Sequence, residues 1–461
     1  MHKYFCLAFI FFSFASLADT DKKNIIFILT DDQRYDNLSC YGNKLIKTPN
    51  LDTLASQGTR FSEMFVTTSI CATSRASIFS GLNETTHGFT FRKPPVSEKI
   101  MDSSYPILLR KNGYKTGFTG KFGVKLANNK KKIQEMFDFY KSFGGPRHYK
   151  QKDGTLRHST ELNGDNACEM IEQFKDGPFC ISVSFGATHA VDGNKKPGDG
   201  HFPWPKATNG LYEDVTFPKP LHDTEEYRKT LPDFITNPDT SMNRYRYYWR
   251  WDEPEKYQIN MRAYARMTTG IDNVVGRIRA KLKEHKLDKN TVIIYTADNG
   301  FFMGNRGFAG KWSHWEESLR VPLIIHDPSS QKTHVSKLMS LNIDLTPTIL
   351  DYAGIEIPSH YQGRSLKTIV EGKTPSKWRS SYFCEHHMPH KQIPKWEGIR
   401  NERFTYAHYY EEDYEFFHDR QKDPQQLKNL INDPEYKEII EKMRAERKAK
   451  KKKFLANPIR K

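Results

Sequence analysis

The run NIIFILT at residues 24–30 is short, apolar and rich in β-branched side chains, and it ends directly at Asp31 and Asp32. Such a run, bounded by polar residues, is typical of a strand that is buried on both faces of a sheet. Three other segments show the same pattern and predict further strands of the same sheet: residues 179–185, 291–296 and 321–325. The sequence therefore predicts a sheet whose central strand runs into a pair of acidic residues.

Segments with helical periodicity separate these strands. In residues 254–285 apolar side chains recur every three or four positions, at Tyr264, Met267, Ile271, Val274, Ile278 and Leu282. Alternating strands and helices predict a layered α/β fold with a largely parallel sheet. Active sites in such sheets lie at the carboxyl ends of the strands, and two strands here end in polar side chains, Asp31 with Asp32 and Asp298 with Asn299.

Residues 190–254 interrupt this alternation because they are rich in proline, glycine and aromatic residues. A long irregular insertion is usually either functional or disordered. The run YRYYWRW at residues 245–251 interleaves aromatic side chains with arginine. We expect this insertion to form an ordered wall beside the active site.

A second region begins near residue 366. It contains strand-like runs at residues 381–384 and 404–410 and ends in a charged helical segment. We therefore predict a catalytic domain at residues 19–365 and a carboxyl-terminal subdomain with a basic terminal helix at residues 366–461.

The amino terminus is typical of an export signal. Lys3 precedes an apolar run at residues 4–14, and the small residues Ser16 and Ala18 fit a cleavage site after Ala18. We therefore predict a signal peptide at residues 1–18 and a periplasmic or secreted mature protein. No later apolar stretch in the sequence reaches the ~18 residues needed to cross a bilayer, so we expect no stable membrane insertion.

The balance of charge and the cysteine count suit an exported protein with an acidic partner. Lysine and arginine number 71 against 55 acidic residues, which gives a formal net charge of +16. Such an excess suggests a polyanion, and export favours an acidic glycan over nucleic acid. The five cysteines after residue 18 include no C-x-x-C pair, so a zinc site of that type is unsupported. An odd count in an oxidising compartment leaves one thiol unpaired, and we expect it to be Cys71.

The segment SICATSRASIFSG places Cys71 just before a predicted helix start, where Ser74 can cap the helix and unpaired amides favour an anion. Arg75 adds a cation beside it. The segment resembles the sulfatase signature C-x-P-S-R-A-x-x-x-T-G, with Thr73 in place of proline and Ser80 in place of threonine. The resemblance implies that a maturation enzyme converts Cys71 to formylglycine, whose hydrated aldehyde attacks the sulfur of a sulfate ester.

The polar side chains at the two strand ends offer only oxygen donors, which suit Ca²⁺ or Mg²⁺ better than Zn²⁺. Taken separately, an Asp-Asp pair is commonly a turn or a helix cap, and Asp-Asn-Gly is a good hairpin turn. Together with the cysteine, these positions match the metal site of the sulfatase family. The resemblance therefore implies Ca²⁺, with Mg²⁺ as the alternative, held by Asp31, Asp32, Cys71, Asp298 and Asn299.

Three further motifs resemble family motifs that supply cations and an acid. GKFG around Lys121 is similar to G-K-W-H, with Gly123 in place of the histidine. The sequence THA around His189 is similar to P-H-x-P and implies that His189 protonates the leaving alcohol. The segment GKWSHWE resembles G-K-x-x-x-x-E and implies that Lys311 binds the sulfate. Taken alone, each lysine would be a surface charge and His189 a loop histidine.

The resemblance extends over residues 24–436 and implies the fold of the alkaline-phosphatase superfamily, with a small antiparallel carboxyl-terminal subdomain. The implied activity is sulfuric ester hydrolysis. Basic charge, export and the aromatic insertion favour a sulfated polysaccharide or oligosaccharide, with the algal glycans ulvan, fucoidan and carrageenan as candidates.

Two alternatives remain open. A phosphoesterase or phosphonate hydrolase of the same superfamily would usually carry two zinc ions with several histidine ligands. A non-catalytic polyanion-binding relative would agree with Thr73 and Gly123, whereas the intact set of metal ligands opposes it.

Overall fold

The computed structural model describes residues 22–460. At its centre is an eight-stranded sheet, in which β1 (Asn24–Thr30) pairs in parallel with β8 (Phe179–Ser184) and β9 (Thr291–Ala297). The strand β12 (Leu323–His326) runs antiparallel to both of its neighbours, β9 and β2 (Thr59–Phe61). The remaining strands are each parallel to the strand beside them: β13 (His334–Ser336), β4 (Lys115–Gly120) and β5 (Phe139–Ser142).

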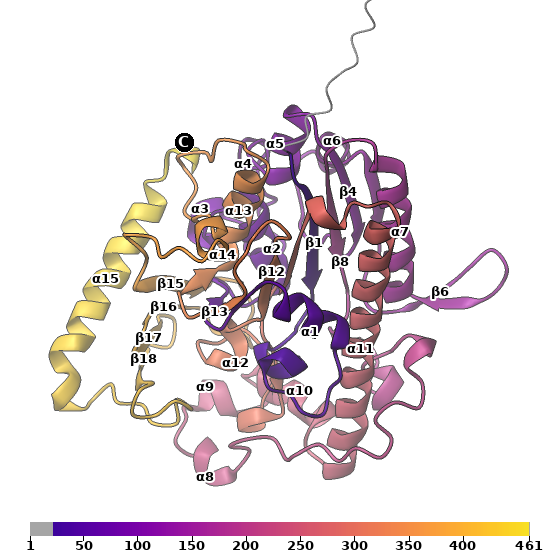
Figure 1. Cartoon of the computed structure of the whole chain (residues 1–461). Coiled ribbons are helices and arrows are strands. Elements are labelled where there is room, and N and C mark those ends of the chain that lie inside the picture. The colour runs from indigo at the N-terminus through magenta and orange to yellow at the C-terminus, as the bar shows by residue number, and fades with distance from the viewer. Residues whose placement is uncertain (1–21, 461) are drawn as a thin grey trace, which may run out of the picture.

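Both faces of β1 are covered, as its unbroken apolar sequence predicts. Alternate side chains of the strand enter two separate cores, because successive side chains of a strand point to opposite faces. The helices α7 (Ser159–Phe174) and α11 (Pro254–Glu284) pack on one face, and α2 (Cys71–Ser80) and α13 (Leu345–Tyr352) lie on the other (Figure 1). The four predicted strands, the long predicted helix and the largely parallel sheet are confirmed.

A separate four-stranded antiparallel sheet follows near the carboxyl terminus. Its strands are β15 (Ser381–His386), β16 (Trp396–Asn401), β17 (Phe404–Tyr409) and β18 (Tyr414–Asp419). One face packs on α15 (Lys437–Leu455), and the other contributes Tyr382, Trp396 and Phe416 to a core of the main sheet. The predicted antiparallel subdomain is confirmed, although the sequence indicated only two of its four strands. The boundary near residue 366 stays a prediction.

The aromatic insertion is more regular than the sequence indicated. Residues 245–250 lie within the nine-residue helix α10 (Met242–Arg250), whose first turn is capped by the side chain of Ser241. Tyr247 and Arg250 are buried, while Tyr245 and Tyr248 are exposed. The expectation of an irregular run is therefore wrong here, because the alternation of aromatic residues and arginine concealed an amphipathic helix.

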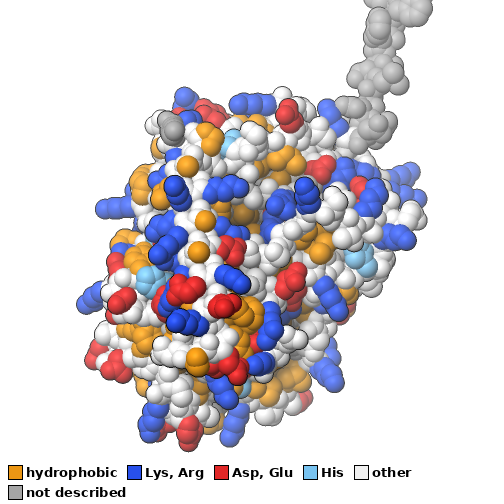
Figure 2. Space-filling model, turned by 90° about the vertical axis from the view of Figure 1, so that its left-hand side faces the viewer, with side chains coloured by type: hydrophobic (Ala, Val, Ile, Leu, Met, Phe, Trp, Pro, Cys, Tyr) orange, Lys and Arg blue, Asp and Glu red, His pale blue; other side chains and the backbone are white. Residues whose placement is uncertain are grey.

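The basic terminal helix is held to its sheet by ion pairs. On α15, Arg447 and Lys451 both pair with the buried carboxylate of Glu397, and Arg444 pairs with Glu415. On this side of the molecule, cationic side chains stand among acidic ones instead of forming a patch of one sign (Figure 2). Part of the charge on α15 therefore serves to dock the helix.

Two expectations concern export and the cysteines. The predicted signal peptide lies outside the described residues, and no helix within residues 22–460 is long and apolar enough to cross a bilayer. All five cysteines in that range are free thiols. The expectation that pairing would leave Cys71 as the single thiol is therefore wrong, because the fold distributes these cysteines without joining any of them.

The carboxyl-terminal subdomain is tied to the main domain by a buried ion pair that can be tested. Both carboxylate oxygens of Asp344 accept from Arg379, and the same oxygens accept from the amides of Leu341 and Arg364 at 2.8 Å. Asp344 is fully buried. Arg379→Ala leaves this carboxylate without its cation and should lower the free energy of unfolding by about 3 kcal/mol.

Chemical denaturation followed by tryptophan fluorescence measures this loss. Lys229→Ala removes one member of the exposed pair with Glu225 and should change stability by less than ~0.5 kcal/mol. Equal stabilities for Arg379→Ala and Lys229→Ala would contradict the assignment.

Candidate active site

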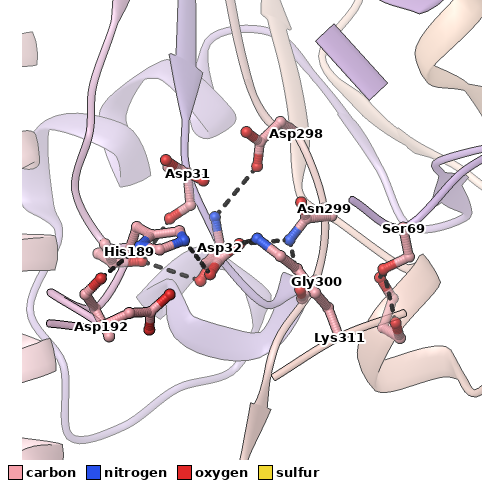
Figure 3. A network of polar contacts seen from close by, with 12 residues as sticks. Asp31, Asp32, Ser69, His189, Asp192, Asp298, Asn299, Gly300 and Lys311 are labelled. Carbon is pink, nitrogen blue, oxygen red and sulfur yellow. Dashed lines mark hydrogen bonds and ion pairs between the residues drawn. The ribbon is translucent and has the colours of Figure 1, made fainter. Parts of the chain in front are cut away.

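The ends of β1 and β9 bring the predicted metal ligands together. Thr30 is paired with Ala297 in the parallel register of these strands, so the residues that follow leave the sheet side by side. The backbone amide of Asp32 donates to Oδ1 of Asp298 at 3.2 Å, and Nδ2 of Asn299 donates to Oδ1 of Asp32 at 2.7 Å (Figure 3). Asp32 has a φ of 56°, a conformation that is costly for a non-glycine residue and that turns its amide toward Asp298.

Cys71 enters the same site from the face of the sheet that α2 covers. It is the first residue of α2, with Ile70 as the N-cap, and it is 6% exposed. Its Sγ and a carboxylate oxygen from each of Asp31 and Asp298 all lie within 4.8 Å of one another. The preceding loop is held by Ser69, whose hydroxyl donates to the carbonyl of Ser318 at 2.7 Å.

The helix begins three residues earlier than its predicted cap. Ser74 lies inside α2, where its hydroxyl accepts from Nδ2 of Asn342 at 2.9 Å. The expectation that Ser74 caps the helix is therefore wrong. No side chain caps the amino terminus of α2, so the amides of the first turn beside Cys71 remain available to an anion.

Three cations face the three carboxylates of the site. Nε of Arg75 donates to Oδ2 of Asp298 at 2.8 Å, and this ion pair is almost fully buried. Nζ of Lys121 contacts Asp31, and Nζ of Lys311 contacts Asp32. The structure therefore brings together every residue that the sequence predicted for the metal site, together with Arg75, Lys121 and Lys311.

Burial and neighbouring charges shift the pKa values of the acidic groups in the site. Burial and the charge of Asp31 raise the pKa of Asp298 to about 7. Burial also opposes ionisation of Asp31, but the charges of Lys121, His189 and Arg75 outweigh it and lower its pKa. Burial raises the pKa of the Cys71 thiol, although Lys121 and Lys311 counteract it. An unmodified Cys71 is therefore biased toward the protonated thiol, which is a poor nucleophile.

The donor set fits a hard divalent cation. Oδ1 of Asp31 and Oδ1 of Asn299 are buried and have no hydrogen-bond partner, although buried polar atoms almost always have one. Both belong to the oxygen-rich cluster at the strand ends. Oxygen donors of this kind suit Ca²⁺ or Mg²⁺, and a cation there would satisfy the orphaned oxygens and relieve the repulsion between Asp31 and Asp298.

His189 follows β8 and lies at the edge of this cluster. Its Nε2 is 3.5 Å from Oδ2 of Asp32, and its Nδ1 lies 2.5 Å from the carbonyl oxygen of Ala190. Nδ1 donates to that carbonyl, so Nε2 is the atom left to exchange a proton with a ligand. Burial lowers the pKa of His189, and the charges of Asp32 and Asp31 oppose that shift.

Comparison with known proteins identifies the family. The family model described as Sulfatase matches residues 23–355, and the model described as N-sulphoglucosamine sulphohydrolase, C-terminal, matches residues 304–453.

This chain belongs to the sulfatase family.

The chain is 29% identical to an N-acetylglucosamine-6-O-sulfatase of Bacteroides thetaiotaomicron, over 91% of this chain and 84% of the relative. It is 26% identical to an ulvan-active sulfatase of Formosa agariphila, over 91% and 79% of the two chains. A solved structure of a protein in complex with its substrate D-glucosamine-2-N,6-O-disulfate superposes with a TM-score of 0.76 and 26% identity, covering 95% of this chain and 99% of that one. As a member of the family the protein is a sulfuric ester hydrolase with the alkaline-phosphatase-like fold.

The structure explains why Gly123 stands where the motif G-K-W-H has histidine. Gly123 has a φ of 73°, and a Cβ placed there would lie 2.9 Å from Cδ of Arg75. The left-handed backbone and the close approach of Arg75 both disfavour any side chain at this position. The chain that carries Lys121 therefore packs directly on the arginine that binds Asp298.

A cavity of about 480 Å³ opens from the site of the sulfatase toward solvent. It is lined by Cys71, His189 and Lys311, and by further residues that the sequence did not single out as site residues: Arg92, Lys93, Asp192, Arg246, Trp312 and His390. Within the lining, Arg246 pairs with Asp192 at 2.9 Å. Arg246 lies in the aromatic run that the sequence marked as functional, and Asp192 follows His189 closely. No local signal indicated Arg92, Lys93 or His390.

The metal assignment predicts that Ca²⁺ stabilises the purified sulfatase. Binding should raise the free energy of unfolding by about 2.7 kcal/mol when free Ca²⁺ is ~100 times its Kd. Asp298→Asn should lose this response, because it removes a charged ligand and keeps the shape of the side chain. A chelator should abolish activity, and Ca²⁺ or Mg²⁺ should restore it better than Zn²⁺.

Thermal unfolding with and without chelator measures the response, and Asp165→Asn, at an exposed ion pair with Arg277, is the matched control. Full activity in metal-free protein, or an undiminished calcium response in Asp298→Asn, would rule out this assignment.

Proposed function

We propose that this sulfatase removes sulfate from a sulfated glycan, using a nucleophile made from Cys71. The observation that carries the proposal is the position of Cys71, at an uncapped helix start between Asp31 and Asp298. The ammonium groups of Lys121 and Lys311 contact Asp31 and Asp32 beside it. The helix start and the two lysines can hold an anion in position while a group at position 71 attacks it.

The charges of the site explain why an anion would bind. The carboxylates of Asp31, Asp32 and Asp298 are balanced by the three cations that face them. A bound Ca²⁺, held by Asp31, Asp32, Asp298, Asn299 and residue 71, would add two positive charges and polarise the sulfate oxygens. Lys121 and Lys311 would then be released from their carboxylates to bind the ester.

The nucleophile proposed at position 71 is formylglycine, made by a maturation enzyme that supplies the oxidant. Its hydrate offers one hydroxyl that attacks sulfur and a second whose deprotonation expels sulfate, which a thiol cannot do. The high pKa of the buried thiol supports this proposal, because an unmodified Cys71 would be largely protonated. Thr73 stands where the family signature has proline. Its Oγ1 accepts from the amide of Phe91 at 3.0 Å and so contributes to the local fold.

His189 is proposed as the acid that protonates the leaving alcohol. It is 20% exposed and lines the cavity that would hold the substrate. Its Nδ1 is held by the carbonyl of Ala190, which orients the ring and directs Nε2 toward Asp32 and the cavity. A proton on Nε2 would be delivered to the departing oxygen.

The proposed substrate class is a sulfated polysaccharide or oligosaccharide met outside the cytoplasm. The cavity wall carries Arg92, Lys93 and Arg246 against the single carboxylate of Asp192, which suits an anionic sugar. Relatives named for N-acetylglucosamine 6-sulfate and for ulvan support this class, and fucoidan and carrageenan are further candidates. The proposed export signal at residues 1–18 and a periplasmic or secreted location agree with such a substrate.

The proposal predicts that activity depends on conversion of Cys71. Peptide mass spectrometry of active protein should show the sulfur at position 71 replaced by oxygen, with the loss of two hydrogens. The active fraction should track this conversion across expression hosts. Cys71→Ala should lower kcat by at least about 10⁴-fold, because the group that forms the covalent intermediate is absent.

Cys168→Ala is the matched control, because Cys168 is a partly buried thiol outside the site, and it should retain full activity. Fully active protein with an intact Cys71 thiol would contradict the proposed mechanism even if it releases sulfate.

The acid role of His189 predicts a dependence on the leaving group. His189→Gln should lower kcat/KM for a sugar sulfate by roughly 10²–10⁴-fold, because a sugar alkoxide leaves only when it is protonated. The same change should lower kcat/KM for 4-nitrophenyl sulfate by less than about tenfold, since nitrophenolate leaves without a proton.

His390→Gln, at another histidine of the cavity wall, is the control. It should change kcat/KM for the sugar sulfate and for 4-nitrophenyl sulfate by the same factor. The role of His189 as the acid fails if its replacement slows both esters by the same factor.

A further inference from the structure

The helix α10 forms part of the wall of the cavity that holds Cys71. Met242 and Arg246 of this helix line the cavity. Because successive residues of an α-helix are rotated by about 100°, Trp249 and Tyr245 flank these two residues. Tyr248 lies on the opposite side of the helix from Arg246. The part of the aromatic run that borders the cavity is therefore Tyr245 with Trp249.

These two rings do not serve the hydrophobic core. Tyr247 and Trp251 are core residues, whereas neither Tyr245 nor Trp249 belongs to any hydrophobic cluster of the described residues. The rings of Tyr245 and Trp249 meet edge to face, with centroids 4.9 Å apart, and Tyr245 is 40% exposed. Trp249 is partly buried, and its ring contacts cationic side chains, among them Arg250 at 5.7 Å. An at least partly exposed aromatic pair outside the hydrophobic core, beside a substrate cavity, points to a ligand.

Cations link these rings to the active site. The guanidinium of Arg246 lies 5.3 Å from the ring of Trp312, a residue of the cavity wall, and 6.0 Å from the ring of Trp249. Nζ of Lys195 stands 4.7 Å from the ring of Trp249 and 6.0 Å from that of Tyr245. The side chain of Lys195 is therefore held over the aromatic pair, and positive charge extends from the cavity along its edge.

We propose that Trp249, Tyr245 and Lys195 form a second sugar subsite, which binds the unit of the glycan next to the sulfated one. This inference rests on the proposed function, because it needs a glycan in the cavity. The C–H face of a pyranose ring is apolar and slightly positive, so it stacks on the negative face of an indole or phenol ring. Lys195, an exposed side chain that lies over the ring of Trp249, would leave the ring face to the sugar and, with Arg246, meet a carboxylate or a second sulfate on that unit. The occupant is thus an anionic neighbouring sugar of the same chain.

The rigid support of α10 favours this assignment. Nδ2 of Asn243 donates to the carbonyl of Lys311 at 2.8 Å, and Arg244 donates to the carbonyl of Gly307. Arg250, fully buried, pairs with Asp192 at 2.6 Å. The helix that presents the aromatic pair is therefore fixed to the segment that carries Lys311 and to the loop after His189, so a sugar on this surface would be held in register with the reacting ester.

The test compares two substrates in four proteins. Tetrasaccharides from ulvan, fucoidan, carrageenan and a glucosamine-6-sulfate glycan are assayed first with the wild type, and the best is then compared with its own sulfated monosaccharide. Trp249→Ala should lower the ratio of kcat/KM for tetrasaccharide over monosaccharide roughly tenfold, the effect of losing about 1.4 kcal/mol of stacking. Trp249→Phe should restore most of the ratio, and Tyr248→Ala should leave it unchanged.

The outcomes separate the two proposals. If the wild type desulfates none of the four tetrasaccharides and none of their sulfated monosaccharides, the proposed function fails. If it desulfates a tetrasaccharide and the ratio is the same in Trp249→Ala as in the wild type, the subsite is overturned and the proposed function stands. A loss of ratio in Tyr248→Ala as large as in Trp249→Ala would also overturn the subsite, because it would show a general effect of disturbing α10.

Discussion

The parallel pairing of β1 with β9 is the constraint on which the rest of the site depends. This pairing aligns Thr30 with Ala297, so the segments that follow the two strands leave the sheet at the same end. Asp31, Asp32 and Asp298 therefore lie together in one buried site. Burying a charge costs several kcal/mol per ion unless opposite charge meets it. The site is therefore stable only with cations around it, and this need organises the loops that surround the sheet.

The cations come from three segments that are far apart in the sequence. Arg75 comes from the helix that begins at Cys71, Lys121 from the end of β4, and Lys311 from the loop that follows a short strand. Each contacts a different carboxylate. The same contacts place the amino terminus of α2, and with it residue 71, against the acidic cluster. The close approach of Gly123 to Arg75 shows how tightly these segments are packed.

The sequence predicted the parts of this arrangement that have local signals. Apolar runs that end in acidic residues indicate strand ends, and this pattern is sufficient to place Asp31 and Asp298 at the ends of two strands. The prediction that Ser74 caps the helix is wrong because serine before an apolar run is a common cap, whereas α2 starts three residues earlier. Arg246 and Trp312 share the cavity wall only because α10 packs beside the segment after Lys311. Neighbourhoods made by tertiary packing of this kind leave no pattern in a single sequence.

The carboxylates, cations and residue 71 of this site favour sulfate monoesters over phosphorus esters, and paired kinetics measure that preference. The sulfate, phosphate and phenylphosphonate esters of 4-nitrophenol share one leaving group, so differences in kcat/KM report how the site treats the transferred group. With fully converted, calcium-loaded protein, we expect the sulfate ester to have the highest kcat/KM of the three. A higher kcat/KM for the phosphate or the phosphonate ester would contradict it.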